Sequence, residues 1–472
     1  MPFFFTQGLG AFNDNVFKNG LAAMLVFNSS EMAGLNTNQI VNLSAMTFIL
    51  PFFLFSALFG QFADKYEKSV QIRRIKLFEV FIMLAATLGF WLNSLPLLLG
   101  VLFMLGFQST MFGPIKYGII PQVLKRHELV GGNALVEMGT FVAILAGTIA
   151  GPLLMGVEAD WPVWISGTAL AIAVAGYMAS LKIPIAPAVA PELKINWNFF
   201  RETIRNIRFI TENRIVLNSV LGISWFWFFG ATFLVQIPSF SENVLGGDAR
   251  LMSTLLAMFI IGISTGSLLC ERLSGGQVEI GLVPFGAAGL TLFGIDMYFA
   301  SPTELAVYTG LGGFFAVGSN LRIVFDLLMI GIFSGFYIVP LYAMVQQNTT
   351  PSHRSRVIAG NNILNSMFMV VSAIIAMVLL GSIGFTIPEL FLFTAILNLV
   401  VAIYIFSIVP EFLMRFLVWI LIHTIYRVEI KGVENIPESG PAIVAANHVS
   451  FVDPLIIGGV IRRPVRFVMY FK

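Results

Sequence analysis

Long apolar runs recur along this sequence, and each has the length of a helix that crosses a bilayer. Stretches such as 39–63, 96–120 and 388–409 are nearly uncharged, and roughly 20 apolar residues suffice to cross a hydrocarbon core of about 30 Å. Residues 305–317 are apolar but short, so they form either a re-entrant or interfacial piece or part of a span. We predict twelve spans, over residues 3–27, 39–63, 75–92, 96–120, 131–155, 161–182, 215–240, 250–270, 277–299, 321–347, 357–380 and 388–409.

Positive charge marks every second connection between these predicted helices. The alternate connections carry acidic residues but no Lys or Arg, apart from Arg250 at the edge of one of them. Because Lys and Arg are retained on the cytoplasmic side during insertion, both termini are predicted to be cytoplasmic. The basic connections hold Lys65, Lys68, Arg73, Arg74 and Lys76, then Lys125 and Arg126, then Lys182, Lys194, Arg201, Arg205, Arg208 and Arg214, and finally Arg272, Arg354 and Arg356.

The composition agrees with a chain that has lipid as its main solvent. With 57% apolar residues, 11% charged residues and a mean hydropathy of +0.87, the chain cannot bury its apolar surface in one water-soluble globule. The net charge of +2 is too small to indicate a nucleic-acid partner. The single cysteine, Cys270, excludes an intrachain disulfide and a cysteine-based metal cluster, so we expect no metal and no cofactor in transport.

A long basic connection divides the twelve spans into six and six. It begins with the proline-rich "IPIAPAVAPEL" and continues as a helix whose residues Phe200, Ile204, Ile207 and Ile210 share one side, so it is expected to lie on the inner membrane surface. The segments "LVGGNALVEMG" from Leu129 and "VIAGNNILNSM" from Val357 align as a faint repeat. The predicted units are a six-helix bundle over 1–182, a linker over 183–214 and a second six-helix bundle over 215–410.

The segment "GQFADKYEKSVQIRR" resembles the loop between the second and third helices of major facilitator transporters. The resemblance implies an all-α membrane protein with about twelve helices in two halves, which are related as parallel repeats. It also implies structural or gating roles for Gly60, Asp64, Lys65, Arg73 and Arg74, although the basic pair comes later here than in the usual pattern. The glycine permits close helix approach, and the Asp can cap a neighbouring helix. An ordinary cytoplasmic anchor loop is the alternative.

Charged side chains inside the predicted spans fall mainly on helices that the resemblance places around a central cavity. A charge at the bilayer centre costs roughly 2.5 to 3.5 kcal/mol, so it should face a cavity or a partner. The expected substrate-binding residues of this kind are Asp14, Asn15, Lys18, Lys116, Glu137, Arg322 and Asp326. Alternatives remain open: Asp14 and Lys18 as a mutual salt bridge, Glu137 and Asp296 in buried structural pairs, and Arg322 reaching the outer headgroups.

The seventh span contains the aromatic run "SWFWFFGATF", from which Trp225 and Trp227 are expected to contribute a wall of the cavity. Packing or an interfacial belt is the alternative for these rings. A cavity that combines both charge signs with an apolar wall suits a zwitterionic headgroup attached to an acyl chain.

The sequence changes character after residue 410. An apolar stretch over 411–427 is predicted to be a membrane-associated hinge, and 428–472 has the look of the start of a cytoplasmic α/β domain, with "VEIKG" and "AIVAAN" rich in strand-forming residues. Within it, "NHVSFVDP" resembles the first motif of glycerolipid acyltransferases. The resemblance implies His448 as a base, Asp453 as its partner and acyl-carrier protein or acyl-CoA as donor. The family's later motifs would lie beyond Lys472, so this chain alone is expected to be inactive in acyl transfer.

The segment "GAFNDNVFKNGLAAML" resembles the first helix of bacterial lysophospholipid transporters. The resemblance implies a flippase that moves lysophospholipids, such as lysophosphatidylethanolamine, from the outer to the inner leaflet of the bacterial inner membrane by alternating access. The fused domain would couple this movement to reacylation, with lysophospholipid, membrane lipids and acyl-carrier protein as partners. Two alternatives stay open: a proton-coupled exporter in which Asp14 or Glu137 titrates, and an acyltransferase whose helices only anchor it.

Overall fold

The computed structural model describes residues 1–27, 37–155, 161–274, 281–304, 310–408 and parts of 418–461. In these residues, twelve long helices coincide with the twelve predicted spans, and ten of them are long and apolar enough to cross a membrane. The chain is therefore a multi-pass membrane protein. The long helices are α1 (Pro2–Phe27), α2 (Thr37–Lys65), α3 (Lys68–Trp91), α4 (Leu95–Val123), α5 (Leu129–Met155), α6 (Trp161–Ser180), α8 (Arg214–Asn243), α9 (Ala249–Ser274), α10 (Leu282–Ala300), α12 (Gly318–Asn348), α13 (Arg354–Met377) and α14 (Ile387–Ile408).

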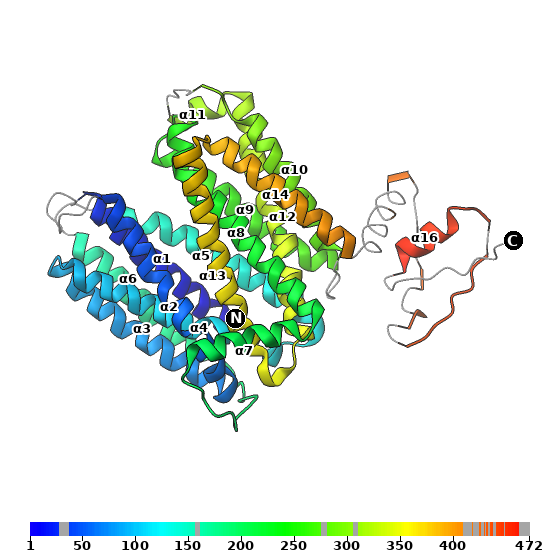
Figure 1. Ribbon diagram of the computed structural model, residues 1–472, viewed down its shortest axis with the longest axis horizontal. Helices are drawn as coiled ribbons and strands as arrows, with labels where there is room; N and C mark the ends of the chain where they lie inside the picture. The colour runs from blue at the N-terminus through cyan, green and yellow to red at the C-terminus, as the bar shows by residue number, and fades with distance from the viewer. Residues whose placement is uncertain are drawn as a thin grey trace.

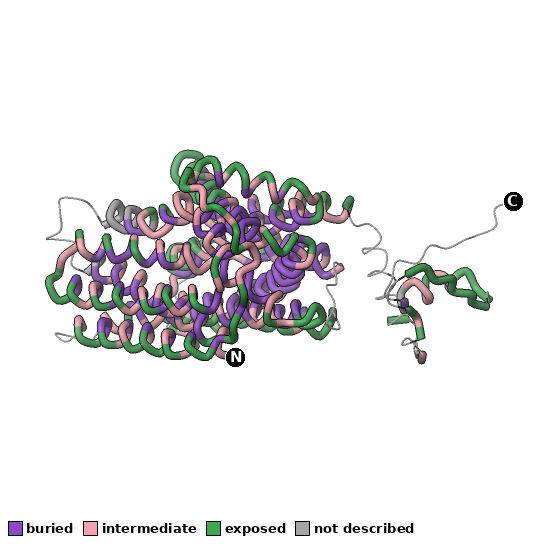
Figure 2. The backbone as a smooth tube through the Cα atoms, turned by 90° about the horizontal axis from the view of Figure 1, so that it is seen from below, coloured by how far each residue is buried: buried purple, intermediate pink, exposed green. Residues whose placement is uncertain are grey.

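The long helices form two groups, which come together at one end of the bundle (Figure 1). In the first group α1 packs on α5 and α6, and α4 lies between α2 and α3. In the second, α12 packs on both α9 and α10, and α14 packs on α10. The groups meet through α2 against α13 and through α5 against α9. Buried positions concentrate where these helices face one another (Figure 2).

Small residues let α2 and α13 approach closely where the two groups meet. A Cβ added at Gly60 would lie 2.7 Å from the Cβ of Ala359 and 3.0 Å from the Cα of Arg356. A larger side chain at residue 60 would therefore push the helices apart, which is the packing logic of small-residue interfaces in membranes.

Asp64, one turn further along α2, joins the two groups by hydrogen bonds and charge. Its carboxylate accepts hydrogen bonds from the backbone N–H of Ser355 at 3.0 Å and of Arg356 at 3.3 Å, in the first turn of α13. The same carboxylate pairs with the Nε of Arg356 at 3.2 Å, and both side chains are buried. A carboxylate at a helix N-terminus is favoured by both the free N–H groups and the helix dipole. Asp64 thus caps a helix of the other half.

Two further contacts close the same end of the bundle. The rings of Tyr117 and Tyr342 stack with centroids 4.1 Å apart, and the side-chain amides of Asn133 and Gln346 exchange hydrogen bonds of 2.7 and 3.0 Å. Each pair joins a helix of the first group to α12. The two halves are therefore held together by aromatic, amide and ionic contacts at the end that bears the basic connections.

The linker is fastened to this closed end. Gln61 of α2 exchanges two hydrogen bonds with the backbone of Asn196, and Arg73 donates to the carbonyl of Ile183. Glu67 accepts hydrogen bonds from the N–H groups of Ala186, Ser69 and Val70. Burial acts to raise the pKa of Glu67, but these bonds outweigh it and hold the pKa below its ordinary value of 4.5. The linker then enters α7 (Phe199–Thr211), which packs on α13, α2 and α8.

The structure differs from the sequence prediction at several boundaries. Helix α3 begins at Lys68 and not near residue 75, because Glu67 caps it by accepting from Ser69 and Val70. Lys76 therefore lies inside the bundle and not in a loop. The short segment near 305–317 contributes α11 (Gly310–Phe315), too short to span a membrane. Helix α13 continues into a π-helical turn over Val378–Ile383.

The C-terminal part is less regular than its sequence indicates. Among its described residues only α16 (Asp453–Val460) is a helix of more than a few residues, and none is in a strand. Residues 441–447 have no backbone partner in the described chain, and a strand requires a hydrogen-bonded neighbour. Most of the predicted hinge over 411–427, and His448, lie outside the described residues.

Replacing Asp64 with Asn should loosen the closed end. The change keeps the shape of the side chain but removes the charge that pairs with buried Arg356, and breaking such a pair costs about 3 kcal/mol or more. This shifts the ratio of open to closed arrangements on the order of a hundredfold. We expect spin labels at Tyr66→Cys and Ser352→Cys, with Cys270→Ala, to report a longer distance by electron double resonance.

Asp248→Asn is the matched control, because Asp248 accepts from the N–H groups of Arg250 and Leu251 within one half. Its label distance should not change. An unchanged distance in Asp64→Asn would show that this carboxylate does not hold the halves together.

Candidate functional site

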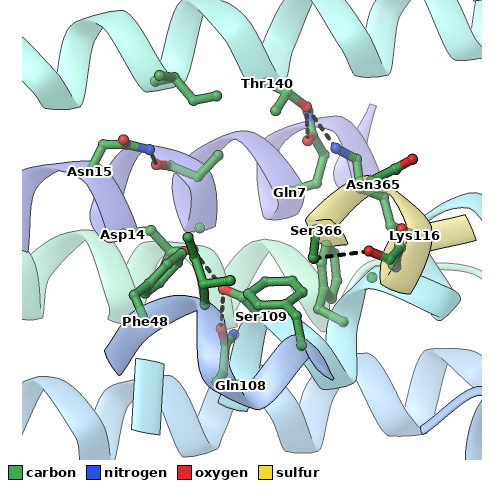
Figure 3. Close-up of a pocket in the computed structure, with 18 of the residues that line it drawn as sticks. Gln7, Asp14, Asn15, Phe48, Gln108, Ser109, Lys116, Thr140, Asn365 and Ser366 are labelled. Carbon is green, nitrogen blue, oxygen red and sulfur yellow. Dashed lines mark hydrogen bonds between the residues drawn. The ribbon is translucent and has the colours of Figure 1, made fainter. Parts of the chain in front are cut away.

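A cavity of about 360 Å³ lies between the two halves, just beyond the closed end. Helices of both groups line it, and Figure 3 shows polar side chains of α1, α4, α5 and α13 facing one another across it. The polar and charged lining residues are Gln7, Asp14, Asn15, Lys18, Lys76, Gln108, Ser109, Lys116, Glu137, Thr140, Asn362, Asn365 and Ser366. The apolar and aromatic lining includes Ile49, Phe48, Phe52, Phe112, Ile144, Trp227, Tyr342 and Met369.

Helix α1 presents Asp14 and Lys18 to the cavity, one turn apart as their spacing predicts. Asp14 accepts a hydrogen bond of 2.6 Å from the hydroxyl of Ser109. Lys18 places its ammonium 5.5 Å from the centroid of the Phe48 ring. Within the described residues, neither a hydrogen bond nor an ion pair joins Asp14 to Lys18. The two charges therefore do not neutralise each other in a salt bridge.

The opposite end of the cavity, near the tyrosine stack, holds Lys116 and Glu137. The ammonium of Lys116 donates to Thr140 at 2.8 Å and lies 5.0 Å from the centroid of the Tyr117 ring. Glu137 accepts a short hydrogen bond from the hydroxyl of Tyr117. Thr140 also donates to Gln7 of α1 at 2.9 Å. This network ties the ionic groups to the ring that closes the bundle.

Lys76 is a cavity residue that the sequence reasoning placed in a cytoplasmic connection. Its side chain is 1% exposed and pairs with Glu79, also 1% exposed, at 2.6 Å. Glu79 additionally accepts from Asn13 at 3.0 Å and from Gln108 at 3.1 Å. A Cβ at Gly10 would lie 2.3 Å from the Lys76 ammonium, so a glycine in α1 leaves the space that this ammonium occupies. The signal in the sequence is the i, i+3 pair of opposite charges at the start of an apolar run.

The second half contributes amides, a hydroxyl and apolar groups to the cavity. These come from Trp227 and Tyr342 and from Asn362, Asn365, Ser366 and Met369 of α13. Asn365 accepts a hydrogen bond of 2.9 Å from Ser224 of α8. All the ionic lining residues belong to the first half, so the two walls differ in chemistry.

Three predicted substrate-binding residues are not brought to this cavity. Trp225 donates to Asn398 at 2.8 Å and stacks on Phe228. Arg322 forms an ion pair with Asp296 of α10, and Asp326 is buried one turn along α12. Tyr342, the residue of α12 that lines the cavity, is 20 positions after Arg322, about 30 Å along a helix with a rise of 1.5 Å per residue. The predicted residues Asp14, Asn15, Lys18, Lys116, Glu137 and Trp227 do line the cavity.

The residues of the predicted gating loop lie away from the cavity, at the closed end. Gly60 and Asp64 form the contacts with α13 described above. Lys65 lies over the Tyr66 ring at 5.6 Å from its centroid, and Arg74 is exposed.

Comparison with known protein families agrees with this architecture. The family model described as Major Facilitator Superfamily matches residues 3–328. The chain belongs to the major facilitator superfamily. The prediction of an all-α membrane protein with two six-helix halves of this fold is thereby confirmed.

The chain is also similar to individual relatives and solved structures. The chain is 29% identical over 362 residues to the lysophospholipid transporter LplT of Escherichia coli strain SE11, covering 76% of this chain and 81% of that protein. It resembles the crystal structure of the human organic anion transporter MFSD10 with a TM-score of 0.66 and 12% identity, covering 85% and 98% of the two chains. It resembles the proton:xylose symporter XylE with a TM-score of 0.64 and 12% identity, covering 87% and 95%. The two structural likenesses show the fold alone.

The C-terminal residues match a second family model. Residues 427–472 match the model described as Acyltransferase. The carboxylate of Asp453 accepts hydrogen bonds from the N–H groups of Val449 at 2.6 Å and Ser450 at 2.8 Å. It therefore fixes the turn that directly follows His448 in the sequence.

The Lys76–Glu79 pair yields a prediction about stability. Lys76→Leu would leave the Glu79 carboxylate buried without its cation, at a cost of about 3 to 5 kcal/mol. The double variant Lys76→Leu with Glu79→Leu removes both charges and should recover most of the loss. Thermal unfolding of the purified protein in detergent would measure both. A double variant as unstable as the single one would contradict this account of the pair.

Proposed function

We propose that this protein is a lysophospholipid transporter of the bacterial inner membrane. One observation carries the proposal: a single cavity between the two halves combines both signs of charge with aromatic and aliphatic walls. A lysophospholipid has the same division, because its headgroup is ionic and its single chain is apolar. The similarity to a protein named lysophospholipid transporter supports the same substrate class.

In this proposal the headgroup occupies the ionic wall. Lys18 and Lys116 supply cations for a phosphate, and Asp14 supplies an anion for an amine. Such contacts are strong in a cavity with little water, because charge-assisted hydrogen bonds are about twice as strong as neutral ones. The acyl chain lies against Phe48 and the apolar residues beside it, or between helices that open to lipid.

We infer that lysophospholipid moves inward, from the outer to the inner leaflet. The closed end bears the basic connections, which supports a cytoplasmic closed end, cytoplasmic termini and a cavity that receives substrate from the outer side. Alternating access would then release a lysophospholipid such as lysophosphatidylethanolamine at the inner leaflet. As part of a complete acyltransferase, the residues that match that family would act there, with His448 as base, Asp453 as its partner and an acyl donor such as acyl-carrier protein or acyl-CoA.

Replacing Asp14 should impair transport with little effect on folding. Asp14→Asn keeps the hydrogen bond from Ser109 but removes the anion, and a charged hydrogen bond contributes about 1.5 to 3 kcal/mol, which is on the order of ten- to a hundredfold in rate or affinity. We expect uptake of labelled lysophosphatidylethanolamine into proteoliposomes to fall by this factor. Lys18→Met should have a similar effect through the phosphate.

Asp296→Asn is the matched control, since Asp296 pairs with Arg322 outside the cavity. Its uptake per folded protein should stay within about twofold of the parent, the scatter expected for surface changes. Unchanged uptake in Asp14→Asn and Lys18→Met would refute the assigned site. Uptake of a small solute that requires a pH gradient, without lysophospholipid movement, would favour a proton-coupled exporter. Full-length protein that moves no lipid would favour a membrane-anchored acyltransferase.

A further inference from the structure

The linker helix α7 has one face packed on the bundle and one face without a protein partner among the described residues. Its packed face consists of Glu202, Asn206 and Ile210, all buried. A Cβ at Gly360 of α13 would lie 2.8 Å from Ile210, which shows how closely the two helices approach. The opposite face is apolar: Phe200 is 69% exposed and Ile204 is 70% exposed.

The apolar strip extends into the residues before the helix. Trp197 is 72% exposed, and one edge of its ring meets Phe62 of α2 at 6.0 Å between centroids. Isolated exposed apolar residues are common, but several large ones side by side mark a contact surface.

A basic strip runs beside the apolar one along α7. Arg201 and Arg208 are exposed, and Arg205 is half exposed while it contacts Glu202 at 3.5 Å. At about 100° per residue, these three arginines fall on the flank of the helix next to Phe200 and Ile204. An apolar strip flanked by arginines is the pattern of a helix that lies in a membrane surface, with its rings at the acyl boundary and its cations among the phosphates.

We propose that the exposed face of α7 and Trp197 bind anionic phospholipid at the membrane surface where the two halves are closed. Charge selects this occupant: three arginines match a surface of phosphate groups, while an apolar protein partner would leave Arg201 and Arg208 without counterions. Position agrees, because the packed face of α7 lies against α2, α8 and α13, the ends of membrane helices. This binding surface is separate from the cavity, so lipid binding there does not depend on which substrate is transported.

A spin label reports the position of this face directly. Ile204→Cys in a Cys270→Ala background gives one labelling site, because Cys270 is the chain's one cysteine. The full chain is reconstituted in vesicles of phosphatidylcholine with or without phosphatidylglycerol. With phosphatidylglycerol, collisions of the label with a water-soluble nickel complex should decrease and collisions with oxygen should increase. High salt should reverse the change, since it screens surface charge.

Two double variants separate charge on α7 from charge in general. Arg201→Gln with Arg208→Gln should return the label to water. Loss of these two cations should lower the equilibrium constant for surface binding by on the order of tenfold or more. Lys125→Gln with Arg126→Gln removes the same charge from exposed positions of another connection and should leave the label in place. The proposal is overturned if the label is equally accessible to nickel with and without phosphatidylglycerol. A label shielded from both reagents even in detergent also overturns it, because protein would then cover the face.

Discussion

The cost of ionic side chains in hydrocarbon governs the structure around the central cavity. An uncompensated charge there would oppose insertion and folding, so each charged group has a cavity, a polar partner or both. Asp14 is held by Ser109, Lys116 by Thr140 and Glu137 by Tyr117. Lys76 is held by Glu79 within its own helix. These contacts fix the direction of each side chain. The hydrogen-bonding atoms that they leave unused face the cavity.

The two halves contribute different kinds of side chain to the cavity. The first half places all the ionic lining residues, and the second half places amides, a hydroxyl and aromatic rings. The contact between halves at Asp64 and Arg356 is itself an ion pair, buried where α2 and α13 touch. Tyr117 connects the ionic wall of the cavity to the closed end, because it donates a hydrogen bond to Glu137 and stacks on Tyr342. In the proposed transport cycle, this connection would link a bound substrate to the contact between the halves that must break.

Much of the fold followed from hydropathy because bilayer thickness sets helix length, and the twelve spans were found within a few residues at most ends. The face of α1 that bears Asp14 and Lys18 followed from helical spacing. Lys76 was missed because basic residues near a helix end look like loop anchors until the helix start at Lys68 is known. The position of Arg322 along the axis of its helix, which the sequence leaves open, keeps it away from the cavity. Trp225 and Trp227 are two positions apart, about 200° around a helix, so only one of the two rings can face the cavity.

Photochemical cross-linking can locate a bound lysophospholipid in the cavity. A lysophosphatidylethanolamine with a small diazirine on its glycerol, which leaves the amine and the phosphate free, is bound to the full chain in vesicles and irradiated. The adducts are located by mass spectrometry. We expect adducts on α1 and α4 around Asp14 and Ser109, and we expect Asp14→Asn to reduce them greatly. Adducts confined to lipid-facing positions, such as Trp164 and Met178 of α6, and unaffected by Asp14→Asn would contradict it.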